Sequence, residues 1–96
     1  MPNSRYLTGA RLERLWRVQM KRRGYITMRS AGSKGLIDCA AWNGDELILA
    51  QIKNGRQAWG PKDVTALMAM PRPKNARVIL YERVGAGGVE WREIEC

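Results

Sequence analysis

The chain has 96 residues, of which 45% are hydrophobic and 27% are charged, a composition that suits one small globular domain and is too short for two. Its 17 Lys and Arg against 9 Asp and Glu give a formal charge of +8, which favours an anionic polymer as partner, nucleic acid before a membrane. The chain contains no His, which excludes chemistry that depends on a His base or a His–zinc site.

The positive charge is concentrated at the start of the chain. Residues 1–30 hold eight basic residues and one acidic residue, a net charge of +7. Residues 77–96 hold three basic and four acidic residues, a net charge of −1. We therefore expect the first part of the fold to form the positively charged surface that binds the anionic partner, and the last part to contribute mainly to the packing of the fold.

Compartment is indicated by two further features. No apolar run approaches the ~20 residues that a membrane helix needs, and no signal peptide is recognisable, so no membrane contact is expected. Cys39 and Cys96 are too few for a disulfide framework, and Cys39 falls in a predicted core strand. A reducing, cytoplasmic setting is the expectation.

A helix is predicted from Thr8 to about Arg23, after a polar, basic arm over residues 1–7. At about 100° per residue, one side of this helix is apolar and the opposite arc is basic. Gly24 is expected to end the helix. The apolar stripe consists of Leu12, Leu15, Trp16 and Met20.

Glu13 falls at the edge of that apolar stripe, and two interpretations stay open. Its side chain can lean towards whatever the helix packs on. Alternatively it can form a surface pair with Arg17 four residues later, worth only about 0.2–0.5 kcal/mol. Spacing alone favours the surface pair.

Residues 25–30 are a short β-prone segment, and residues 31–35 form a loop with two glycines and Lys34. The backbone N–H groups of such a loop can face a phosphate. The loop lacks the spacing of a P-loop, so no nucleotide cofactor is expected. A plain connector carrying one solvated lysine explains the same composition equally well.

Residues 36–42 and 46–53 are predicted to pair as a hairpin around Asn43-Gly44, the strongest short-range hairpin signal. Both faces of this hairpin are largely apolar, so it should be central in the sheet with helices covering it. Gln51 and Lys53 share one face because side chains alternate along a strand. Asp38 joins them if the connecting loop has an even number of residues, as Asn43-Gly44, Gly44-Asp45 and residues 43–46 all have.

The second half of the chain contributes a helix and two strands. Residues 54–59 form a polar loop that includes Arg56, and Gly60-Pro61 starts a helix with Asp63 in its first turn. The buried stripe of this helix is predicted as Val64, Leu67 and Met68.

Pro71 and Pro73 end the second helix, and strands are predicted over residues 76–83 and 89–95 with a Gly-rich turn at 85–88. The order α-β-β-β-α-β-β predicts an α/β domain with a central mixed sheet flanked by helices. No functional signal is found after Pro71.

An acid, an amide oxygen and an amine on one sheet face fit a site for phosphodiester cleavage. Mg²⁺ takes oxygen ligands, which Asp38, Gln51 and the Ile52 backbone oxygen can supply. Lys53 can orient the attacking water or offset developing negative charge. The pattern by itself also fits a buried Asp38–Lys53 ion pair capped by Gln51, and slightly favours that simpler interpretation.

These residues resemble a known family. Glu13 in the first helix, Arg29-Ser30, Asp38 after the Gly-rich loop, and Gln51 and Lys53 at the end of the hairpin stand in the order of the PD-(D/E)xK nuclease superfamily. The resemblance is strongest to the archaeal-type Holliday junction resolvases and their phage and bacterial relatives, and covers roughly residues 9–53. It implies a restriction-endonuclease-like core and a single nuclease domain over residues 1–96.

The resemblance implies a role for each matched residue. The catalytic set would be Glu13, Ser30, Asp38, Gln51 and Lys53. The metal, Mg²⁺ with Mn²⁺ as a substitute, would be held by Asp38, Gln51, the Ile52 backbone oxygen and Glu13. The departure is Gln51, because these resolvases usually carry Glu there; an amide removes one negative charge and should weaken metal binding.

The expected partner is branched or duplex DNA, with the phosphates contacted by Arg11, Arg14, Arg29, Lys34 and Arg56. The family implies a homodimer, working in a prokaryotic or phage-infected cell. Three functions stay open: an endonuclease that resolves four-way junctions by paired nicks, a phage nuclease for flaps or other branched DNA, and a structure-selective DNA-binding protein that does not cleave.

Overall fold

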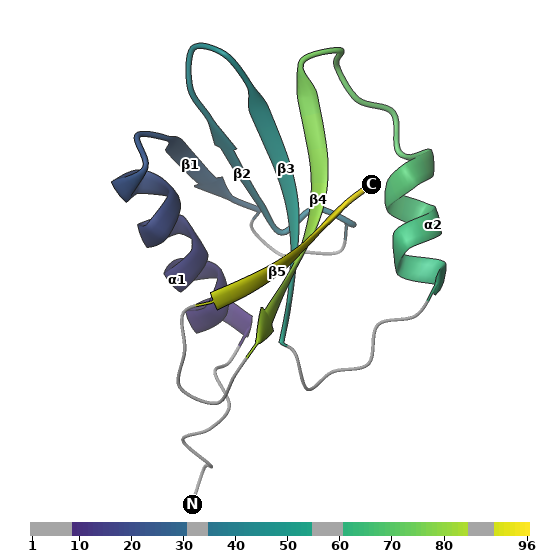
Figure 1. Ribbon diagram of the computed structural model, residues 1–96, viewed down its shortest axis with the longest axis horizontal. Coiled ribbons are helices and arrows are strands. Elements are labelled where there is room, and N and C mark those ends of the chain that lie inside the picture. The colour runs from purple at the N-terminus through teal and green to yellow at the C-terminus, as the bar shows by residue number, and fades with distance from the viewer. Residues whose placement is uncertain (1–8, 31–34, 55–60, 85–89) are drawn as a thin grey trace, which may run out of the picture.

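Two helices and five strands occupy the residues that the computed structural model describes, 9–30, 35–54, 61–84 and 90–96. Figure 1 shows them in space. In chain order they are α1 (Gly9–Arg22), β1 (Ile26–Arg29), β2 (Cys39–Trp42), β3 (Leu47–Asn54), α2 (Pro61–Ala69), β4 (Ala76–Val84) and β5 (Glu90–Glu95). The predicted order α-β-β-β-α-β-β is confirmed.

The strands form a mixed sheet in the order β1-β2-β3-β4-β5. β3 and β4 run parallel, while the other neighbouring pairs run antiparallel. β3 is therefore the central strand, as the two apolar faces of the hairpin predicted. No helix in the described ranges is long and apolar enough to cross a membrane.

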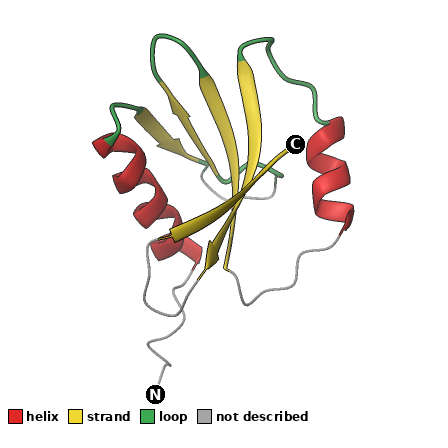
Figure 2. Ribbon diagram, in the orientation of Figure 1, coloured by secondary structure: helices red, strands yellow, loops and turns green. Residues whose placement is uncertain are grey.

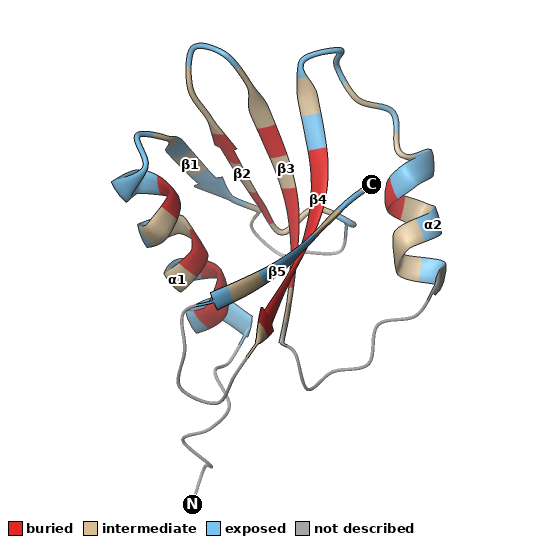
Figure 3. Cartoon of the chain, viewed as in Figure 1, coloured by how far each residue is buried: buried red, intermediate tan, exposed pale blue. Residues whose placement is uncertain are grey.

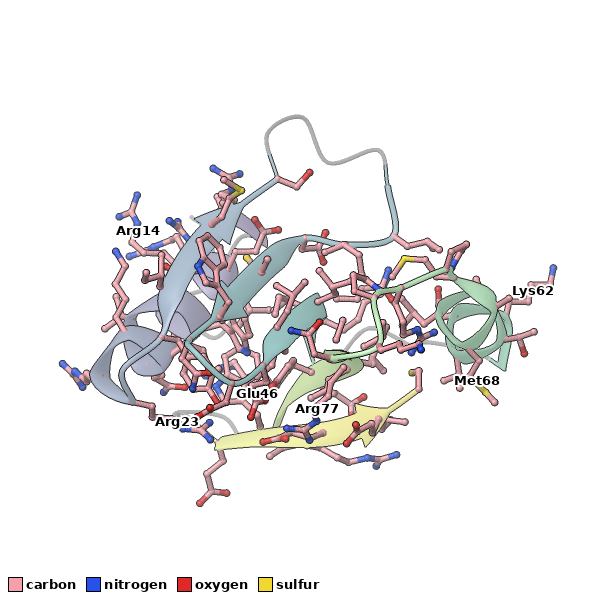
Figure 4. The ribbon with its side chains drawn as sticks, turned by 90° about the horizontal axis from the view of Figure 1, so that it is seen from above. Arg14, Arg23, Glu46, Lys62, Met68 and Arg77 are labelled. Carbon is pink, nitrogen blue, oxygen red and sulfur yellow. The ribbon has the colours of Figure 1, made fainter. Side chains whose placement is uncertain are left out.

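α1 forms where apolar residues recur at helical spacing. Leu12, Trp16 and Met20 are buried against the sheet, while Arg14 points away from it in Figure 4. The helix stops before Gly24, whose φ of +95° is a conformation that residues with a side chain rarely adopt. The predicted helix and its glycine stop are confirmed.

The hairpin closes through the even-length loop 43–46. Trp42 pairs with Leu47 across it, and the Asn43 side-chain oxygen accepts the N–H groups of Asp45 and Glu46 at 2.8 and 2.9 Å, an Asx-type turn. The strand predicted over residues 36–42 is shorter than expected, since β2 begins only at Cys39.

The sheet separates two cores, and one helix covers each face (Figures 1 and 2). α1 packs on the face formed by Cys39, Ala41, Ile48, Ala50, Ile52, Ile79 and Tyr81. α2 packs through Leu67 on the opposite face, against Val78 and Leu80. β4 contributes to both cores, and Figure 3 shows it buried along most of its length.

The buried stripe predicted for α2 is wrong at Met68. Leu67 is fully buried and Val64 half-buried, but Met68 is 63% exposed and points away from the sheet in Figure 4. The helix packs over the β4 side of the sheet through a narrow contact, so only one edge of its apolar surface is covered. Met70, just past the helix, joins that core instead.

Arg72 ties the end of α2 to the last strand. Its guanidinium donates to the main-chain oxygens of Leu67, Met68 and Met70, and to that of Cys96 at 2.6 Å. The last carbonyls of a helix have no partner within the helix, so this side chain satisfies groups that would otherwise be left unpaired.

Replacing Arg72 with Ala should therefore lower the free energy of unfolding by about 1–3 kcal/mol, because several acceptors lose their donor together. Urea denaturation followed by circular dichroism measures the change. Lys74→Ala, which removes a nearby exposed cation, is the matched control and should stay within about 0.5 kcal/mol of the wild type. Equal losses in the two variants would contradict this role of Arg72.

Candidate functional site

Asp38 is held by main-chain groups between β1 and β3. Its N–H donates to the Ala50 oxygen at 2.8 Å, and its own carbonyl accepts the Ser30 N–H at 2.8 Å. Its carboxylate accepts the Ile52 N–H at 2.8 Å. Asp38 therefore meets β3 on both sides of Gln51, and the carboxylate has a fixed partner other than Lys53.

These bonds correct the prediction that Asp38 lies within a regular strand. The residue precedes β2. Its side-chain carboxylate accepts the Ile52 N–H of β3, which a main-chain oxygen would accept if the strand pairing continued. The predicted proximity of Asp38 and Gln51 survives this change, because the even-length turn brings the β2 end opposite the same part of β3.

Gln51 is 8% exposed, and its side-chain oxygen is buried without a hydrogen-bond partner among the described residues. Leaving a buried acceptor unpaired costs roughly 1–3 kcal/mol, so an oxygen in this state suits a cation as its partner. Lys53 lies two residues further along β3, on the same face and half-buried.

Glu13 leans towards the sheet and does not form the surface pair with Arg17. It is 9% exposed, and Arg29 on β1 donates from Nε to its carboxylate at 2.8 Å. Spacing along α1 favoured Arg17 because it ranks only neighbours on the same helix. The partner instead comes from β1, which α1 crosses.

The charges predicted for the site gather around the thiol of Cys39. The pKa of this thiol is raised to about 12, mainly by burial and also by the Glu13 and Asp38 carboxylates, while Arg17 and Arg29 act in the opposite direction. The thiol is 1% exposed on the α1 face of β2. Glu13 and Asp38 therefore act on one small region of the molecule, although they come from different elements.

Because its pKa is raised, the Cys39 thiol should stay protonated at pH 9 and resist alkylation, since the thiolate is the nucleophile. Burial also raises the pKa of the Cys96 thiol, but Cys96 is only half-buried, so iodoacetamide at that pH should modify Cys96 in the native protein well before Cys39. Both should react in urea. Mass spectrometry of peptides reports the order, and equal native rates would contradict the burial of Cys39.

The predicted phosphate-binding residues divide into two groups. Arg11 and Arg14 are exposed on α1, and Arg29 is exposed on β1 while it bonds to Glu13. Lys34 and Arg56, together with the arm over residues 1–7, lie outside the described residues.

Glu82 on β4 is a residue that the sequence argument missed. The register pairs it with Lys53 on β3 and with Arg92 on β5. It is 8% exposed, with Arg92 Nε at 3.7 Å from its carboxylate. An acid directly after the apolar run Val78–Tyr81 was the available signal, but only strand pairing reveals that Lys53 is its neighbour.

Comparison with known proteins gives a fold. No family model and no curated protein match the chain. A solved structure does: the Archaeoglobus fulgidus protein Hjc, a Holliday junction resolvase from an archaeal hyperthermophile, with a TM-score of 0.70 and 22% sequence identity. The match covers 91% of this chain and 71% of that chain. This chain shares the fold of that resolvase.

With the resolvase fold established, the predicted restriction-endonuclease-like architecture is confirmed. The roles of individual residues remain predictions at this level of identity. The possible ligands can be judged on their own chemistry: a carboxylate, a buried amide oxygen with no hydrogen-bond partner in the described ranges, and a main-chain oxygen are hard ligands that fit Mg²⁺. Within the described ranges no three His, Cys, Asp or Glu side chains gather as a metal cluster.

Proposed function

We propose that this protein is a metal-dependent DNA endonuclease that resolves four-way junctions by paired nicks. One observation carries the proposal: Gln51, whose buried side-chain oxygen has no hydrogen-bond partner among the described residues, lies on β3 between the two residues whose main chain binds Asp38. The resolvase fold supports it, because the neighbour that shares this fold is a Holliday junction resolvase.

Mg²⁺ bound at these ligands would stabilise negative charge on the attacked phosphodiester and lower the pKa of a bound water. Asp38, Gln51 and the Ile52 backbone oxygen would hold the ion, with Glu13 reaching it directly or through water. The bond from the Ile52 N–H orients the Asp38 carboxylate before any ligand arrives. Lys53 would position the attacking water or offset developing charge, and Ser30 would complete the catalytic set.

The basic residues would position the DNA without reading its sequence. Arg11 and Arg14 extend from α1, and the bond to Glu13 holds Arg29 in place beside the site. Contacts of this kind act on phosphates and release counterions, so junction binding should weaken steeply as salt is raised. Lys34 and Arg56 would extend the same surface.

Two nicks on opposed strands require two active sites, and one chain supplies one. We therefore infer a homodimer as the active species. Light scattering or sedimentation of the pure protein, with and without a four-way junction, measures this directly.

A cleavage assay on synthetic four-way junctions with Mg²⁺ or Mn²⁺ tests the function. Symmetric paired nicks on the junction are the expected result. Cutting of flaps in preference to junctions would favour the broader branched-DNA nuclease. A band shift without cleavage would overturn the proposed activity and favour a junction-binding protein that does not cleave. Gln51 is the reason to consider this alternative, because an amide there should weaken metal binding.

A further inference from the structure

A row of alternating charges crosses three strands beside the proposed metal site. Lys53 on β3 pairs in register with Glu82 on β4, and Glu82 pairs with Arg92 on β5. Residues paired in register point to the same face of a sheet, and neighbouring strands lie about 4.8 Å apart. The strand order places β4 between β3 and β5, and in Figure 1 β5 passes in front of the lower parts of the other two strands. The carboxylate of Glu82 is thus the side-chain neighbour of Lys53 on the face that carries Gln51.

Glu82 is more buried than either cation of the row. Its side chain is 11% exposed, against 60% for Arg92, whose Nε stands 3.7 Å away, and Lys53 is half-buried. Removing a carboxylate from water is costly unless a cation compensates it, and the more enclosed of its two cationic neighbours in the row is Lys53. The Glu82 carboxylate therefore lies between Arg92, an exposed cation that contacts it, and Lys53, a half-buried cation at the paired position of the next strand.

The charge balance of the proposed site explains why such an acid would be needed. Magnesium sites in proteins usually present one or two carboxylates. Here Asp38 supplies one, Gln51 is neutral, and the carboxylate of Glu13 is bonded to Arg29. Lys53 then cancels the charge of Asp38, so the nearest side chains would present almost no net attraction to a divalent cation.

We propose that Glu82 is a positioning residue that compensates for the neutral Gln51: by neutralising Lys53 it restores the negative potential that metal binding requires. This inference rests on the proposed metal site and extends it to β4, where the sequence carries no recognisable motif. It predicts that the effect of residue 82 on metal binding depends on the residue at position 51.

Metal binding by the full chain without DNA tests the proposal, with free Mn²⁺ counted by electron paramagnetic resonance at one fixed pH. Glu82→Gln should weaken Mn²⁺ binding because the charge of Lys53 is no longer offset. We expect a loss of roughly 10- to 100-fold, similar to the loss when a residue that hydrogen-bonds to a metal ligand is replaced. Adding Gln51→Glu to that variant should restore most of the affinity. The gain from Gln51→Glu should be larger in the Glu82→Gln protein than in the wild type, because the two acids act on the same charge balance.

Two single variants serve as controls. Glu93→Gln removes the same charge from β5 on the opposite face, since Glu93 pairs with Tyr81 of the α1 core, and should leave Mn²⁺ binding unchanged. Arg92→Gln removes the exposed cation beside Glu82 and should strengthen Mn²⁺ binding. Arg92→Gln also tests the proposal if Glu82→Gln fails to fold, which a thermal melt would reveal.

The outcomes separate the two proposals. If Asp38→Asn loses Mn²⁺ binding while Glu82→Gln and Arg92→Gln bind as the wild type does, the metal site stands and the role of Glu82 is overturned. Equal gains from Gln51→Glu in both backgrounds overturn it as well. If the wild type binds no Mn²⁺ at all, the metal site of the proposed function fails and this inference fails with it.

Discussion

Replacing Asp38 with Asn should reduce junction cleavage by roughly a thousandfold or more while leaving junction binding within about threefold of the wild type. The carboxylate has a fixed orientation because it accepts the Ile52 N–H at 2.8 Å, next to Gln51 in the chain. An amide keeps the size of the side chain but loses its charge, so the metal would be held weakly. Single-turnover cleavage and gel-shift titration measure the two quantities.

Asp45→Asn is the matched control for this variant. Asp45 is an exposed acid in the hairpin turn, and its structural contact is made by its N–H group, which the substitution keeps. Cleavage by Asp45→Asn should equal that of the wild type. Full cleavage by Asp38→Asn would remove Asp38 from the site and with it the proposed metal ligation.

Trp16→Ala should lower the free energy of unfolding by about 3–5 kcal/mol, a large part of the stability expected for a domain of this size. Trp16 is 1% exposed at the centre of the α1 core. Its ring packs edge-on against Tyr81 of β4, with 5.2 Å between ring centroids. The substitution would leave a cavity between α1 and the sheet and would loosen the helix that carries Glu13. Urea denaturation followed by circular dichroism measures the loss.

Met68→Ala provides the comparison, because it also truncates a large apolar side chain on a helix but at a 63% exposed position. Its effect should stay within about 0.5 kcal/mol. A similar loss in both variants would mean that burial does not decide the contribution of these side chains.

Local rules predicted the elements because each depends on neighbours in the sequence. The apolar stripe of α1 needs only 3.6 residues per turn, and the glycine stop needs only the positive φ of Gly24. The hairpin was predictable for the same reason: Asn43 closes the turn with its own side chain, and an even-length loop sets which side chains share a face.

The same rules failed where a contact spans the fold. Spacing gave Glu13 a partner on its own helix, whereas the structure pairs it with Arg29, 16 residues away. It also placed Asp38 within a regular strand and Met68 in the core. In each case the deciding contact comes from another element, whose position no local pattern encodes.

The sequence by itself determined the order of elements, the basic character of α1 and the shared face of Gln51 and Lys53, because periodicity and charge are properties of adjacent residues. Tertiary structure alone decided that Asp38 binds the main chain of β3, that the buried side-chain oxygen of Gln51 has no partner in the part of the chain that the structure describes, and that Glu82 lies beside Lys53. The reason is that pairing a strand with a distant one brings together side chains whose separation along the chain carries no signal.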